Sequence, residues 1–101
     1  MSEQQKYSNV TKDYLCRFYE ILSDMIKGMT EAELTCSISH NFIVQMIPHH
    51  QGAIRMSENA LRFEICSELI PILDAIIISQ REGVREMERL LSTMCSTACG
   101  E

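Results

Sequence analysis

Helical periodicity is the feature that most constrains the fold of this chain, because it covers almost all of the 101 residues. Apolar residues recur at intervals of three and four along three long segments, at about residues 9–29, 37–63 and 67–95. We find no strand-type alternation, internal repeat or low-complexity tract in the sequence. The chain is therefore predicted to be all-α.

The middle segment has the most regular pattern, a heptad seam whose members face one way along a helix. The seam consists of Phe42, Met46, His49, Ala53, Met56, Ala60 and Phe63. A parallel stripe contains Ile43, Ile47, His50, Ile54 and Leu61. Both histidines thus lie on the apolar arc of the helix, and we expect them to point into the protein. Pro48 removes one backbone hydrogen bond, which predicts a kink or break in this helix.

Three long helices with short connections favour an antiparallel up-down helical bundle, formed as a single domain over residues 1–101. A break at Pro48 would raise the number of helices to four. The two ends, residues 1–8 and 96–101, are expected to fray. Because three helices with wide apolar stripes make only a thin core, we expect either that fourth helix or a homodimer.

Composition excludes several classes of function. A net charge of −5, with nine Lys and Arg scattered along the chain, argues against a nucleic acid partner. The apolar runs are too short to span a bilayer, and the first nine residues lack the apolar core of a secretory signal. We therefore expect a cytoplasmic protein without a membrane partner. Five cysteines, an odd number, predict reduced thiols rather than a disulfide framework.

The histidines are expected to face the third helix. If the second and third helices fold back at a turn near residue 65, His49 comes level with Gly83, and Met46 with Met87. A glycine inside a helix costs roughly 1 kcal/mol relative to alanine. Gly83, like Gly52 beside the histidines, is therefore predicted to allow a close backbone approach or to make room for a bulky neighbour.

Imidazole nitrogen and thioether sulfur together form a soft, uncharged set of ligands. A pocket of His and Met without carboxylates selects Cu(I) and Ag(I) and discriminates against Mg²⁺ and Ca²⁺. The candidate metal ligands are Met46, His49, His50, Met56 and Met87. The pattern predicts a non-catalytic protein that binds a soft metal ion, copper above all, for storage, buffering or tolerance.

Two other interpretations of these residues stay open. Methionine is a common filler of helical cores, and buried histidines are often held by hydrogen bonds alone. The chain would then be a helical homodimeric interaction module without a metal, its histidines being structural. A second constellation consists of two i,i+4 pairs that the bundle places at one end, a candidate Cys₃His site for zinc or copper. Its members are Cys36, His40, Cys95 and Cys99.

Enzymatic activity is not expected from this sequence. No Ser or Cys nucleophile and no second carboxylate is spaced to act with His49 or His50. The Glu-x-x-His motif of carboxylate-bridged di-iron bundles does not occur in the chain.

The run FIVQMIPHHQGAIRM, followed by IIISQREGVREM, resembles the domain-of-unknown-function 305 family over residues 41–91. The resemblance implies a ferritin-like helical bundle. Some exported members bind copper or silver in metal tolerance, so it also implies metal handling by the five candidate ligands. This sequence differs from the family pattern at Gly83, where the family has a glutamate, and it lacks the His- and Met-rich N-terminal region of many exported relatives.

Overall fold

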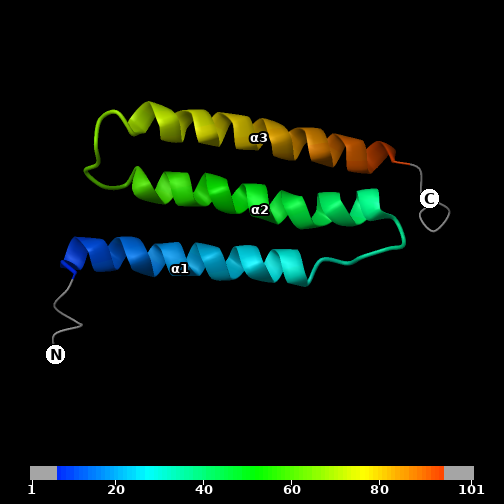
Figure 1. The fold of residues 1–101 in the computed structure, drawn as a ribbon, viewed down its shortest axis with the longest axis horizontal. Coiled ribbons are helices and arrows are strands. Elements are labelled where there is room, and N and C mark those ends of the chain that lie inside the picture. Colours follow the sequence, from blue (N-terminus) through cyan, green and yellow to red (C-terminus); the bar gives the residue numbers. More distant parts are fainter. Residues whose placement is uncertain (1–6, 95–101) are drawn as a thin grey trace.

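The computed structural model describes residues 7–94, which form three α-helices. They are α1 (Asn9–Thr30), α2 (Ile38–Ala60) and α3 (Ile70–Thr93). Figure 1 shows the three helices antiparallel and side by side, with α2 between α1 and α3. The predicted all-α, up-down arrangement is confirmed. Over the residues that the structure describes, no helix is long and apolar enough to cross a membrane.

The sequence predicts a kink or a break at Pro48, and the break does not occur, because α2 runs unbroken through the proline. A proline inside a helix removes one hydrogen bond and costs about 3 kcal/mol. Pro48 also packs against α1 at Gly28. Gly28 of α1 lies so close that a Cβ at its position would be 2.8 Å from Cβ of Pro48. The described part of the chain therefore has three helices rather than four.

Serine side chains cap the first two helices. The Ser8 hydroxyl accepts a hydrogen bond from the Thr11 N–H at 3.2 Å, and the Ser37 hydroxyl accepts one from the His40 N–H at 3.1 Å. Such caps satisfy backbone donors that have no partner within the helix. Ser8, which we expected to fray, is thus a helix cap. The other expected frayed ends, residues 1–6 and 96–101, lie outside the described residues.

Glycines bring α1 and α2 close together. At Gly52 of α2, the side chain of Met25 occupies the space that a Cβ would need. Gly28 lies against Pro48 in the same way, one turn further along α1. The prediction that Gly52 makes room for a bulky neighbour is confirmed, and the neighbour is a methionine of α1.

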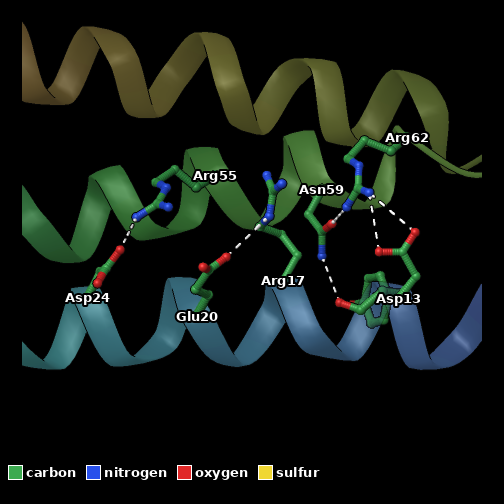
Figure 2. Close-up of polar contacts among 8 residues, drawn as sticks. Asp13, Arg17, Glu20, Asp24, Arg55, Asn59 and Arg62 are labelled. Carbon is green, nitrogen blue, oxygen red and sulfur yellow. Dashed lines mark hydrogen bonds and ion pairs between the residues drawn. The ribbon is translucent and has the colours of Figure 1, made fainter.

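A buried amide also joins α1 to α2, as Figure 2 shows. Asn59 is only 3% exposed, and its Nδ2 donates a hydrogen bond to the backbone carbonyl of Tyr14 at 3.1 Å. Its Oδ1 accepts a hydrogen bond from Nη1 of Arg62 at 2.7 Å, and Arg62 also reaches the Asp13 carboxylate at 3.4 Å. Both ends of this buried side chain are satisfied, so its burial does not leave a polar group without a partner.

The core consists of two narrow strips, one on each side of α2. The buried apolar side chains of the described residues are Ile21, Ile43, Leu73, Ile77 and Val84. The main helix contacts are those of α2 with α1 and of α2 with α3. The molecule measures 14 Å along its shortest axis, close to the diameter of one helix with its side chains. The helices therefore form a single layer.

The two faces of this layer differ in chemistry. Ion pairs bridge neighbouring helices on one face, which we call the charged face: Asp24 with Arg55 and Glu58 with Arg81, both at 3.0 Å. Helical periodicity places uncharged residues on the opposite side of all three helices. This apolar face consists of Leu15, Phe18, Leu22 and Met29 on α1, Phe42, Met46, His49, Ala53 and Met56 on α2, and Ile72, Ile76, Gln80, Met87 and Leu90 on α3.

The predicted heptad seam of α2 lies on the apolar face and not between the helices. Phe42 is 58% exposed and His49 is exposed, whereas Ile43, Gly52 and Asn59 are buried between neighbouring helices. The reason is that α2 is the middle helix and contacts partners on two opposite sides, which leaves the seam uncovered. The expectation that both histidines point into the protein is therefore wrong for His49.

The expectation of reduced thiols is wrong for Cys36, which is disulfide-bonded. An odd number of cysteines requires only that one of them has no disulfide partner within the chain. Cys16 and Cys66 are free and exposed. The Cys66 thiol donates a hydrogen bond to Oε1 of Glu68 at 3.0 Å, and this bond lowers the pKa of the Glu68 carboxyl.

We expect Gly28→Ala to destabilise the protein by roughly 1–2 kcal/mol, because the added methyl group would collide with the rigid ring of Pro48. This net loss allows for the better helix propensity of alanine. Denaturant unfolding followed by circular dichroism measures the change. Ser23→Ala, at an exposed position of the same helix, is the control and should be neutral or stabilising. Equal stabilisation by both substitutions would contradict the close approach of α1 to α2.

Asn59→Ala should lower the free energy of unfolding by about 1–3 kcal/mol, because it leaves the Tyr14 carbonyl and the Arg62 guanidinium without their amide partner. Gln51→Ala removes an exposed amide from the same helix and should change stability by less than about 0.5 kcal/mol. Denaturant unfolding of both variants makes the comparison. A loss at Asn59 no greater than that at Gln51 would show that the buried bond does not hold the helices together.

Candidate functional site

A hydrogen bond to the main chain fixes the tautomer of His50. Its Nδ1 lies 3.0 Å from the carbonyl oxygen of Met46, one turn earlier in α2. Because a carbonyl oxygen can only accept, Nδ1 carries the hydrogen, and Nε2 of the neutral ring has the free lone pair. Metal-binding histidines are commonly oriented by this kind of bond from the other ring nitrogen. His50 is thus set up to offer Nε2 as a ligand.

Gly83 of α3 makes room for the His50 ring. A Cβ at Gly83 would lie 3.2 Å from Cδ2 and 3.7 Å from Nε2 of that ring. The predicted role of Gly83 is therefore confirmed, although His50 makes the contact rather than His49. In an antiparallel pair, a contact between residues 50 and 83 brings Met46 level with Met87. This is the register that the sequence predicts for α2 and α3.

His49 lies beside His50 on the apolar face. The two ring centroids are 6.0 Å apart, and the ring planes are inclined by 62°. His49 is exposed, whereas His50 and Met46 are partly buried. Met46 precedes the two histidines by three and four residues, so all three side chains lie within one turn of α2. The Met46 sulfur and the two imidazoles therefore project from the same part of the helix.

Met56 belongs to a different level of the layer. It follows His49 by seven residues, which is about 10 Å along the helix axis at 1.5 Å per residue. One ion cannot bind both side chains at that separation. Of the five candidate ligands, the structure brings Met46, His49 and His50 together on α2 and places Met87 at their level on α3. Met56 is set apart from them.

The methionines of α1 are not among the candidate ligands predicted from the sequence. Met25 packs against Gly52, two residues after His50, and Met29 lies one turn further along α1. Met29 is also on the apolar face, next to the contact of Gly28 with Pro48. The spacing of Gly28, Met25 and Met29 along α1 predicts that these methionines lie near α2 only if the register of α1 against α2 is known.

The second constellation receives no support from its described members. Cys36 is disulfide-bonded and does not offer a thiolate, and Nδ1 of His40 lies 3.2 Å from Oδ1 of its neighbour Asn41. Cys95 and Cys99 lie outside the described residues. Within residues 7–94, no three His, Cys, Asp or Glu side chains come together as a potential metal site.

Comparison with known proteins identifies a family for most of the chain. The family model described as "Domain of unknown function (DUF305)" matches residues 22–93, from the middle of α1 to the end of α3. No curated protein and no solved structure matches the chain. The matched range includes both histidines, all the methionines named above and the three interhelical glycines. The chain therefore belongs to the DUF305 family.

Proposed function

We propose that this protein is a non-catalytic binder of a soft monovalent metal ion, Cu(I) or Ag(I), which serves metal storage, buffering or tolerance. The observation that carries the proposal is the orientation of His50. Its Nδ1–H is bonded to the Met46 carbonyl, so the Nε2 lone pair is free on the side of α3.

The chemistry of the surrounding face favours a soft ion of low charge. The apolar face carries no carboxylate, so hard divalent ions would not find the oxygen ligands that they prefer there. Thioether sulfur and imidazole nitrogen bind Cu(I) well. Neutral ligands leave the charge of the ion uncompensated, and a single positive charge is less costly than two in an apolar environment.

The proposed ligand set joins α2 to α3. Met46, His49 and His50 come from one turn of α2, and Met87 comes from the facing level of α3. Such a set supplies four neutral donors. Met56, which the sequence analysis included, lies about two turns away and is proposed to remain outside this site.

Silver binding followed by NMR of isotope-labelled methionine methyl groups tests the proposal. We expect one equivalent of Ag(I) to shift the methyl signals of Met46 and Met87 and to leave that of Met56 unchanged. Because thiolates bind Ag(I) more tightly than thioethers, the titration is done on protein whose free thiols, including those of Cys16 and Cys66, have been alkylated. The signals are assigned from single Met→Leu variants.

The matched controls are histidine variants. The His49→Ala, His50→Ala double variant should lose the methyl shifts at one equivalent, because both imidazoles are removed. His40→Ala removes the remaining histidine, which lies at the start of α2, and should leave the shifts intact. Shifts of Met46 and Met87 that persist in the double variant, or their absence in the native protein, would contradict the proposed site.

A second candidate function is a helical homodimeric interaction module without a metal. The observation that favours it is the exposure of His49 in the middle of an otherwise uncharged face. In such a module the histidines would be structural and would only form hydrogen bonds. The silver titration separates the two functions, since a module without a metal site predicts no saturable shift of the Met46 and Met87 methyl groups.

A further inference from the structure

The apolar face has no fully charged side chain at any of its positions. Within α1, α2 and α3, every Asp, Glu, Lys and Arg lies outside it, and the histidines on it are His49 and its neighbour His50. Charged side chains of these helices instead form ion pairs on the charged face, such as that of Arg55 with Asp24. Large contiguous apolar patches are rare on monomeric soluble proteins and usually mark an interface.

Three large apolar side chains of this face are more than half exposed, and its other large apolar side chains are partly exposed. Phe42 of α2 is 58% exposed, and Ile72 and Leu90 of α3 are 55% and 53% exposed. These residues lie on two helices and face the same direction. Stable domains bury such faces between at least two layers of secondary structure. The described residues supply one layer, so a second layer has to come from elsewhere.

The size of the face matches what a stable dimer needs. A helix of 22 to 24 residues is about 35 Å long at 1.5 Å per residue. Three such helices packed 8–10 Å apart present a face of roughly 1,000 Å². Two copies placed face to face would bury roughly 2,000 Å² of surface in total. This area lies at the upper end of the range for standard interfaces and at the lower end of the range for obligate homodimers.

We propose that a second copy of this chain covers the apolar face with its own apolar face, as a two-fold symmetric dimer. A copy is the fitting occupant because its face is also uncharged, so no charge is buried without a partner. The charged faces of both layers stay in water, and the net charge of −5 per chain is kept out of the interface. The closed pair leaves no open apolar face for further growth.

The proposal accounts for the position of His49. This residue is the midpoint of α2, which spans residues 38–60, and α2 is the middle helix of the layer. His49 therefore lies at the centre of the face, and a second copy would cover it. This interface does not depend on the proposed metal binding, because the apolar side chains that form it extend over all three helices.

Two isoleucines of α3 provide a matched test. Ile72 lies on the apolar face and Ile78 lies off it, and they are 55% and 60% exposed. We expect the native protein to sediment with the mass of two chains at micromolar concentrations. Ile72→Glu should weaken the dimer at least tenfold, because it buries a carboxylate in the interface, whereas Ile78→Glu should leave the dissociation constant unchanged.

Circular dichroism of each variant shows whether it is folded. If Ile72→Glu does not fold, Ile72→Ser, which removes apolar area without adding a charge, replaces it and should still weaken the dimer relative to Ile78→Ser. The proposal is overturned if the native protein is monomeric. It is also overturned if the Ile72 variant and the matching Ile78 variant have the same dimer dissociation constant. Ile72 is eleven residues from Gly83, about 16 Å along α3, so silver binding to Met46 and Met87 can be measured separately.

Discussion

The packing of α2 against helices on both of its sides is the constraint on which the structure depends. Three glycines allow the close contacts: Gly28 and Gly52 towards α1, and Gly83 towards α3. These contacts fix how far each outer helix is shifted along α2 and how each is rotated about its own axis. The rotation in turn decides which residues lie on each face of the layer. A change in any one of these contacts would therefore alter both faces.

The candidate site is a product of that packing. The residue that fills the space over Gly83 is the histidine whose other ring nitrogen is bonded to the Met46 carbonyl. One imidazole thus joins two helices and keeps a free lone pair. The same rotation that directs Arg55 and Glu58 to the charged face directs Met46 and His49 to the opposite one. The metal proposal and the dimer proposal both follow from this division into two faces.

Periodicity in the sequence predicts the three helices and their order, because it reflects local backbone geometry. The register of α2 on α3 is also predictable, since a short connection leaves little freedom between neighbouring helices. The surroundings of the α2 seam are not predictable in this way. A heptad pattern tells which residues share a face but not whether another helix covers it, and so His49 was expected to be buried.

Two further differences have the same origin. The cost of Pro48 was judged from α2 alone, whereas the contact with Gly28 comes from another helix. The contact of Met25 with Gly52 is not predicted because the shift of α1 along α2 cannot be read from either helix. Both cases depend on contacts between segments that are distant in sequence, and periodicity within one segment carries no information about them.

The single-layer arrangement also has a consequence for folding kinetics. The main contacts in the described residues join helices that follow each other in the chain, so the entropy lost on closing loops is small. Domains of such low contact order fold within microseconds to milliseconds. The two helical hairpins share only α2, and each can form before the other. The order in which α1 and α3 dock on α2 is therefore left open by the topology, and either route leads to the same native layer.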